Sequence, residues 1–177
     1  MKKFMLLAVM VALVVPVAAF ATGAPTPSAT ASRFCKQAQT SMGATLFAQT
    51  YASNASKSNA FGKCTSKNAA VARQDVNNAA KSCKALQTDP NFAMNHGGKT
   101  FAQYYGNAKG KNSVANAYGK CVAMAVSASI TAQAKVTVSA AKSCKAALKA
   151  SASSFATKYG TGTDAFGKCV ALTATAK

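Results

Sequence analysis

Apolar residues between Phe61 and Leu86 recur at steps of three, four or their multiples, which is the spacing of one helix face. At 100° per residue these positions fall within an arc about 120° wide, and the neighbouring lysines lie outside that arc. The apolar face comprises Phe61, Cys64, Ala72, Val76, Ala79, Cys83 and Leu86, and the lysines are Lys63, Lys67, Lys81 and Lys84. The pattern predicts one long helix with an apolar face and a cationic side.

A second long helix is predicted from about Ala117 to Ala150. Its apolar side comprises Tyr118, Cys121, Val122, Ala125, Ala132, Val136, Ala140 and Ala147, and the opposite side carries Lys120, Lys135, Lys142, Lys145 and Lys149. The central stretch SASITAQAKVTVSA is rich in β-branched residues, which are also typical of strands. Because this stretch joins alanine-rich helical ends with no Gly or Pro between them, we expect the helix to continue through it.

Three units of the chain share one pattern, which runs from a Cys-Lys pair through Phe-Ala-x-x-Tyr to an aromatic-Gly-Lys-Cys ending. The units span residues 35–64, 83–121 and 144–169, and their ring pairs are Phe47 and Tyr51, Phe101 and Tyr105, and Phe155 and Tyr159. Two rings one helical turn apart predict a short amphipathic helix in each unit. We expect the rings to pack in the core, while a stacking platform for sugars or bases is the alternative.

A short polar residue precedes each ending, and a glycine lies within it. The polar residues are Asn59, Asn116 and Asp164, and the glycines are Gly62, Gly119 and Gly167. A short polar side chain at the start of a helix accepts hydrogen bonds from free N–H groups, so we expect each of these residues to cap a helix. A glycine has no side chain, so a neighbouring backbone can come close at these three positions.

The six cysteines predict disulfides, because their number is even and no two lie closer than 19 residues. On the predicted helices Cys64 lies about 28 Å from Cys83, and Cys121 about 35 Å from Cys144, so neither pair can bond within its helix. Antiparallel helices bring Cys83 to Cys121 and gather the other four cysteines at the opposite end. There, closeness along the chain favours the pairs Cys35–Cys64 and Cys144–Cys169.

These features predict an all-α fold, in which disulfide-stapled helical hairpins form a small bundle and consecutive units share their long helices. The F-A-x-x-Y-G and N-A-F-G-K-C pieces of residues 35–169 resemble the two-cysteine repeat modules of small exported proteins from high-GC Gram-positive bacteria. The resemblance implies a helical, disulfide-bearing, secreted module and supplies no activity. Unit one departs from the pattern at Ala52, which replaces the glycine after the tyrosine, and unit two carries an insertion around NFAMNHGGK.

The N-terminal residues 1–21 have the form of a cleavable export signal, with two lysines, an apolar stretch and an Ala-x-Ala ending at Ala21. Pro16 and the small-residue ending favour cleavage over a membrane anchor, so we expect a secreted protein with no integral membrane span. Residues 22–32 are rich in Pro, Ser, Thr and Ala and predict a flexible spacer. A single helical domain is expected over residues 33–177, and the sequence does not indicate an oligomeric state.

The chain is nearly without acids: it has no Glu, its only carboxylate side chains are Asp75, Asp89 and Asp164, and His96 is its only histidine. Mechanisms that use paired carboxylates, a Ser/His/Asp relay or a His-rich metal site therefore lack residues. Closely spaced cysteine pairs, as in zinc and c-type haem sites, are also absent. We expect no enzymatic activity, no catalytic residue, no cofactor and no bound metal, and we expect His96 to be an exposed loop residue.

The charge balance is one-sided, with 21 Lys and Arg against 3 Asp and Glu and a formal net charge of +18. Removal of Lys2 and Lys3 with the signal leaves +16. Such a surface repels itself, so we expect the lysine faces to bind an anionic polymer, such as teichoic acid, acidic polysaccharide or extracellular DNA. Two alternatives stay open: a cationic membrane-active or antimicrobial protein, and a structural surface protein with no specific ligand.

Overall fold

The structure is a computed structural model that describes residues 23–106 and 116–175. The predicted export signal, residues 1–21, lies outside this part of the chain. Within it the regular structure consists of eight helices and no strand, so the all-α fold class is confirmed. The helices are α1 (Pro27–Met42), α2 (Ala44–Tyr51), α3 (Ala60–Thr88), α4 (Phe92–Asn95), α5 (Phe101–Tyr105), α6 (Ala117–Ala150), α7 (Ala152–Tyr159) and α8 (Ala165–Thr175).

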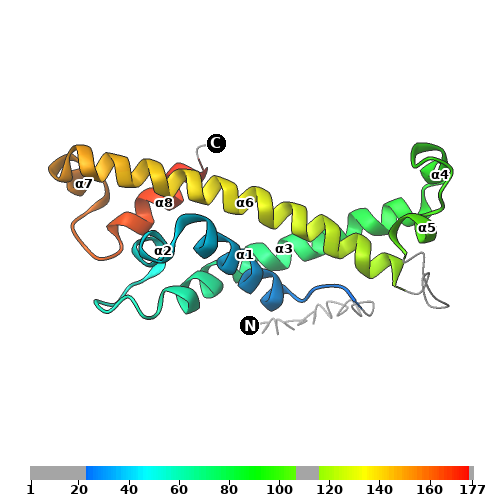
Figure 1. Cartoon of the computed structure of the whole chain (residues 1–177), viewed down its shortest axis with the longest axis horizontal. Helices are drawn as coiled ribbons and strands as arrows, with labels where there is room; N and C mark the ends of the chain where they lie inside the picture. Colours follow the sequence, from blue (N-terminus) through cyan, green and yellow to red (C-terminus); the bar gives the residue numbers. More distant parts are fainter. Residues whose placement is uncertain (1–22, 107–115, 176–177) are drawn as a thin grey trace, which may run out of the picture.

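Two long helices, α3 and α6, form the axis of an elongated bundle (Figure 1). They run antiparallel and pack against each other, and α1 lies against both. α2, α7 and α8 gather at one end of the bundle, whereas α4 and α5 form the turn at the other end. The long helices have nearly the bounds that the hydrophobic periodicity predicts, and α6 continues through its β-branched centre.

All three predicted disulfides are confirmed: Cys35–Cys64, Cys83–Cys121 and Cys144–Cys169, with Cα–Cα distances of 5.9, 5.9 and 6.0 Å. Each links two helices across a connection that carries one or more of the short helices α2, α4, α5 and α7. The six cysteine side chains are at most 2% exposed. Each disulfide therefore belongs to the core and also restricts the unfolded chain, which stabilises the folded state by about 3–4 kcal/mol per bond.

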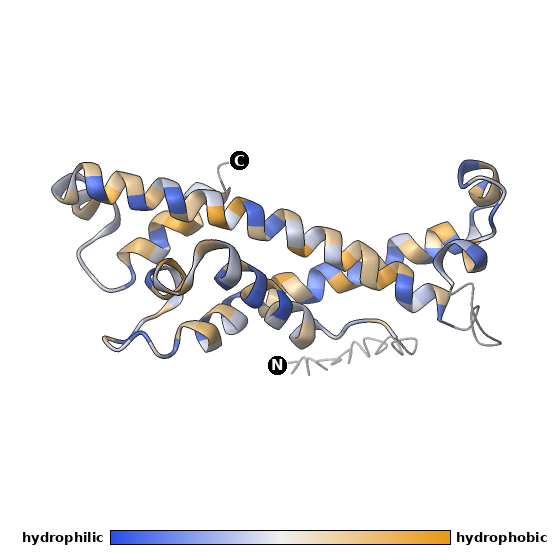
Figure 2. Ribbon diagram, in the orientation of Figure 1, coloured by the Kyte–Doolittle hydropathy of each residue, from blue (hydrophilic) through white to orange (hydrophobic). Residues whose placement is uncertain are grey.

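Hydrophobic residues occur along both long helices (Figure 2), and the buried ones form two groups. A larger group of buried residues joins α1, α2, α3 and α6 and includes Phe34, Phe47, Val76 and Val126. A smaller group surrounds the third disulfide and includes Leu46, Phe155, Phe166 and Val170. The expected core packing of the phenylalanine rings is confirmed, because Phe47, Phe101 and Phe155 are 1%, 8% and 6% exposed.

The expected flexible spacer, residues 22–32, is wrong from residue 27 onward, because α1 begins at Pro27. Proline is well suited to the first turn of a helix, since its missing N–H has no partner there. The hydroxyl of Thr26 accepts a hydrogen bond from the N–H of Ala29 at 3.2 Å and caps the helix. Thr30 and Ala31 are buried, so the small residues of this stretch contribute to the core.

The buried face of α6 agrees with the predicted one only in part: Cys121, Val122 and Ala140 are at most 2% exposed, as predicted. Ala132 and Ala147 are exposed, whereas Val126, Ile130 and Ala134 are at most 3% exposed. α6 packs against α1 on one side and against α3 and α8 on others, so its buried face is set by several neighbours. Phe61 on α3 also departs from the prediction, since its side chain is 39% exposed, although its ring lies near that of the core residue Phe47 at a centroid distance of 6.4 Å.

The predicted caps of α3 and α6 have the right positions but not the expected hydrogen bonds. Asn59 and Asn116 precede α3 and α6, but neither side chain accepts a capping hydrogen bond. Asn59 instead exchanges hydrogen bonds with Ser53, accepting from its N–H at 3.2 Å and donating to its hydroxyl at 3.0 Å. Asp164, immediately before α8, forms an ion pair with Lys168 at 3.0 Å. Asn59 therefore holds the preceding loop, and Asp164 binds a neighbouring lysine, whereas the amide oxygen of Asn116 is buried with no hydrogen-bond partner among the described residues.

Candidate anion-binding surface

Each of the three carboxylates of the chain has a partner, which leaves most cations unpaired. Asp75 lies between α3 and α6 and accepts a hydrogen bond from the side-chain amide of Gln133 at 2.8 Å. Asp89 accepts from the N–H of Asn91 at 2.9 Å, at the end of α3. The ion pair between Asp164 and Lys168 is the one salt bridge within the described residues. The hydrogen bond from Lys168 lowers the pKa of Asp164, so this carboxylate is charged throughout the neutral range.

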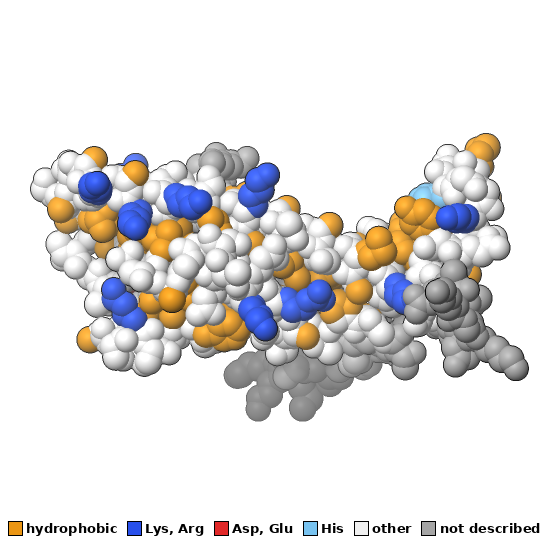
Figure 3. Space-filling model, in the orientation of Figure 1, with side chains coloured by type: hydrophobic (Ala, Val, Ile, Leu, Met, Phe, Trp, Pro, Cys, Tyr) orange, Lys and Arg blue, Asp and Glu red, His pale blue; other side chains and the backbone are white. Residues whose placement is uncertain are grey.

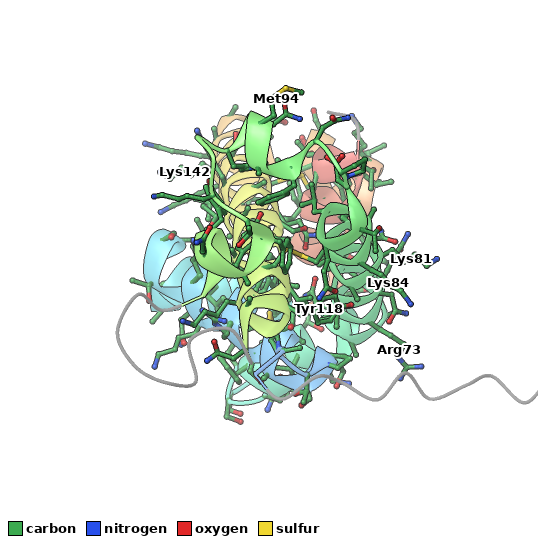
Figure 4. All side chains as sticks on the ribbon, turned by 90° about the vertical axis from the view of Figure 1, so that its right-hand side faces the viewer. Arg73, Lys81, Lys84, Met94, Tyr118 and Lys142 are labelled. Carbon is green, nitrogen blue, oxygen red and sulfur yellow. A yellow bond between two sulfur atoms is a disulfide. The ribbon has the colours of Figure 1, made fainter. Side chains whose placement is uncertain are left out.

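The nine predicted lysines lie on the surface, but they do not form one patch. Lys120 is partly exposed, and the other eight are exposed: Lys63, Lys67, Lys81, Lys84, Lys135, Lys142, Lys145 and Lys149. On the face in Figure 3, cationic side chains are spread along the molecule. Figure 4 shows Lys81 and Lys84 on one side of the bundle and Lys142 on the opposite side. The structure thus divides the predicted surface into separate faces on α3 and α6.

The outer face of α3 combines cations with side-chain amides. Arg73 and Lys81 border an open groove of about 590 Å³, together with Gln74, Asn77 and Asn78. Lys84 continues this face by one helical turn, and Arg73, Lys81 and Lys84 point to the same side in Figure 4. We call Arg73, Gln74, Asn77, Asn78, Lys81 and Lys84 the α3 outer face. Their side chains make no hydrogen bond or ion pair with other residues that the structure describes, so their donors are available to a ligand.

Sequence reasoning identified the lysines of this face but missed Arg73 and the three amides. Arg73 and Asn77 are four residues apart, and so are Asn77 and Lys81, so all three lie on one side of a helix. This spacing was visible in the sequence as a polar stripe. The amides are not distinctive in the sequence because they carry no charge. Their availability to a ligand depends on no other helix covering this face of α3, which only the packing shows.

His96 lies in a turn of the unit-two insertion, as predicted, but its side chain is only partly exposed and belongs to an aromatic cluster at the α4 end of the molecule. Its ring stacks on Phe92 with a centroid distance of 3.8 Å and meets Tyr104 edge-on at 4.7 Å. Its Nδ1 lies within hydrogen-bond distance, 2.8 Å, of the carbonyl oxygen of Phe92, which fixes the ring against α4. The histidine therefore packs the insertion of unit two.

Neither a metal site nor an isolated apolar helix is found in the described part of the chain. In residues 23–106 and 116–175 no cluster of three or more His, Cys, Asp or Glu side chains is arranged to hold a metal ion. α6 is long and apolar enough to cross a membrane by length and composition, a test that core helices of bundles also meet. α6 packs against α1, α3 and α8 and is linked by disulfides through Cys121 and Cys144.

Comparisons of the chain with protein-family models, with curated proteins and with solved structures found no match. The function must therefore be argued from the surface and the cavities of this molecule.

Proposed function

We propose that this protein is a secreted, non-catalytic cationic protein that associates electrostatically with an anionic polymer of the cell envelope or the extracellular matrix. Teichoic acid, acidic polysaccharide and extracellular DNA are the candidate polymers. The observation that carries the proposal is the α3 outer face, where three cations and three amides have no partner among the described residues and no carboxylate shares the face.

Export is supported by the disulfides and by the N-terminal sequence. Three buried disulfides are compatible with an oxidising extracellular environment, since reducing compartments keep cysteines as thiols. The Ala-x-Ala pattern ending at Ala21 is typical of a cleaved signal. The resemblance of the repeated motifs to exported two-cysteine modules agrees with both. On this proposal the folded protein acts outside the cell, where soluble polyanions and wall polymers are its available partners.

The geometry of the α3 outer face suits a chain of repeated anions. Arg73 and Lys81 are about 12 Å apart along the helix axis, and Arg73 and Lys84 about 16 Å, at 1.5 Å per residue. A row of charges at this spacing meets several successive anions of an extended polymer, and the intervening amides can donate hydrogen bonds to phosphate or sugar oxygens. Because the contact consists of dispersed lysines with one arginine, it favours general polyanion binding over reading of a base sequence.

A titration of the oxidised mature protein tests the proposal. Binding to teichoic acid, an acidic polysaccharide and DNA is measured at several salt concentrations, and the affinity should fall steeply as salt rises. The triple variant Arg73→Gln, Lys81→Gln and Lys84→Gln should bind more weakly, and the slope of log affinity against log salt should become shallower by about 2.

The matched control carries the same loss of charge on α6, as Lys142→Gln, Lys145→Gln and Lys149→Gln. These three lysines are exposed on one helix but have no neighbouring amides. If both triple variants lose the same affinity, net charge and not the α3 outer face is responsible. Absence of binding to every polymer, even at low salt, contradicts the whole proposal.

A membrane-active protein is the second candidate, and the length and apolar composition of α6 favour it. Insertion of α6 would require it to leave α1, α3 and α8, to which packing and two disulfides hold it. This candidate predicts that the protein makes anionic vesicles leak at low protein concentration after its disulfides are reduced, but not while they are intact. Polymer binding without leakage favours the polyanion proposal.

A further inference from the structure

A groove of about 580 Å³ lies between α2, α3, α6 and α8, on a different part of the molecule from the α3 outer face. This volume falls in the usual range of sites for small ligands, about 300–1,000 Å³. Its walls are mainly apolar and include Phe34, Val71, Val136, Val170, Ala171 and Ala174. Val71 is 42% exposed, so the groove leaves a large apolar side chain open to water. An apolar ligand surface would cover it favourably.

Most of the polar side chains in the lining already donate hydrogen bonds within the bundle. The hydroxyls of Thr50, Thr137 and Thr175 donate to backbone carbonyls of their own helices at 2.8, 2.9 and 3.2 Å. The amides of Asn68 and Gln133 donate to the carbonyl of Cys64 and to the carboxylate of Asp75. These groups therefore make the surface of the groove less polar than its composition suggests.

Lys67 differs from the other polar side chains of the groove. It is exposed, and its ammonium makes no hydrogen bond or ion pair with any residue in the described part of the chain. It lies beside Gly167, where a Cβ atom would be 4.0 Å from the Lys67 Nζ. Lys67 acts electrostatically on Asp164, but Asp164 is already paired with Lys168 at 3.0 Å. Asp75, also on α3, accepts a hydrogen bond from Gln133 of the groove lining at 2.8 Å. Lys67, Lys168 and Asp164 together carry one net positive charge at the edge of the groove.

We propose that this groove binds a single long-chain carboxylate, with the carboxylate at Lys67 and the alkyl chain along the apolar walls. A fatty acid matches both features, because it combines one negative charge with an apolar chain that needs shelter from water. A phosphate monoester, with nearly two charges, would require a second cation, and Lys67 is the one Lys or Arg that lines the groove among the residues that the structure describes. A neutral chain would leave the Lys67 ammonium without a partner.

Calorimetric titration of the oxidised mature protein with dodecanoate, below the concentration at which it forms micelles, tests this site. We expect saturable binding of one dodecanoate per protein. Dodecanol, which has the same chain without the charge, should bind about tenfold more weakly, since one charge-assisted hydrogen bond is lost.

The variants separate the head group from the chain. Lys67→Gln should weaken dodecanoate binding about tenfold and leave dodecanol binding unchanged, whereas Lys63→Gln removes the same charge outside the groove and should have no effect. Val71→Asn places a polar amide in the wall and should weaken both ligands. Val71 is exposed, so this variant should keep the helical circular dichroism spectrum and the three disulfides.

Several results would overturn the site. Non-saturating uptake of many dodecanoate molecules indicates adsorption to surface lysines in general, and equal affinity of the wild type and Lys67→Gln excludes the assigned head-group contact. Self-association of the ligand-free protein that Val71→Asn disperses means that a second copy covers the groove. The Arg73, Lys81 and Lys84 triple variant should bind dodecanoate normally, so failure of the fatty-acid site is distinguishable from failure of polymer binding.

Discussion

At the scale of single residues, Gly62 and Gly167 have different roles despite similar sequence surroundings. A Cβ atom at Gly167 would lie 2.7 Å from the backbone oxygen of Thr50, so α8 packs directly on α2 at this point. A Cβ atom at Gly62 would have no neighbour within 4 Å among the described atoms. The expectation of a close backbone is therefore confirmed at Gly167. It is wrong at Gly62, where no other part of the described chain approaches the helix within 4 Å of the Cβ position.

The two glycines make a matched pair of substitutions. Gly167→Ala should lower the free energy of unfolding by about 1–3 kcal/mol, because the backbone of Thr50 cannot move without shifting α2. Gly62→Ala should raise it by about 0.5–1 kcal/mol, since alanine has less freedom than glycine in the unfolded chain. Denaturant unfolding with the disulfides intact measures both. Similar effects of the two substitutions would contradict the close packing of α8 on α2.

Tyr51 links stability to alkaline pH. Burial raises its pKa from 10.0 to about 12, and a hydrogen bond with Asn68 opposes part of this rise. The folded state therefore favours the neutral phenol, so its contribution is complete below pH 10 and is lost as the pH rises towards 12. The loss amounts to about 3 kcal/mol at most.

Short unfolding experiments between pH 9 and pH 12 test this effect. Tyr51→Phe should show a smaller loss of stability over this range than the wild type, although it is less stable at neutral pH because the hydrogen bond with Asn68 is lost. Tyr104→Phe is the control, since the Tyr104 side chain is 46% exposed. Parallel pH profiles of the wild type and Tyr51→Phe would show that Tyr51 does not cause the alkaline loss.

At the scale of helices, the largest difference between prediction and structure is the rotation of α6 about its own axis, which sets its buried face. The spacing of its apolar residues is compatible with several faces, because alanine occurs all round the helix. The contacts with α1, α3 and α8 bury Ala134, which is 2% exposed, and leave Ala132 in contact with water. Two alanines only two positions apart therefore have opposite environments, as expected for a helix that turns 100° per residue.

A lysine scan of these two positions measures the orientation. Ala134→Lys should lower the free energy of unfolding by more than about 3 kcal/mol, because it forces an unpaired charge between α6 and its neighbours. Ala132→Lys should change it by no more than about 0.5 kcal/mol, since its side chain can extend into solvent. The opposite order would mean that α6 presents its sequence-predicted face to the core.

At the scale of the whole molecule, the charge distribution opposes the compact fold. The elongated shape spreads the cations along the bundle (Figures 1 and 3). One ion pair, Asp164–Lys168, is present in the described residues. The disulfides and the buried groups of aliphatic and aromatic side chains hold the chain together against this repulsion. An anionic partner would remove the repulsion, which agrees with the proposed function.

The stability of the free protein should therefore increase with salt. We expect Tm to rise by a few degrees between low-salt buffer and about 0.5 M NaCl, because screening weakens repulsion among exposed charges. The triple variant on the α3 outer face has three fewer charges and should show a smaller rise. A Tm that stays constant or falls with salt would mean that repulsion among the cations does not limit stability.

Much of the fold was predictable because it depends on short-range geometry. The period of the apolar residues located α3 and α6, and the rigid rise of a helix excluded two cysteine pairs before any tertiary contact was known. The start of α1 and the packing of His96 were not predictable in this way. The start of α1 is marked by its cap Thr26 and by Pro27, not by a period of apolar residues, and His96 packs against the ring of Tyr104 on another turn.

The sequence by itself determined the helical class, the two long helices and the three disulfides, because periodicity, helix rise and chain connectivity leave few other arrangements. It also determined the excess of positive charge. Only the tertiary structure decided which side of α6 is buried, which cations share a face with free amides, and that Lys67 borders an apolar groove. These properties depend on contacts between helices that are far apart in sequence, because those contacts decide which side chains are buried and which hydrogen-bond donors have no partner.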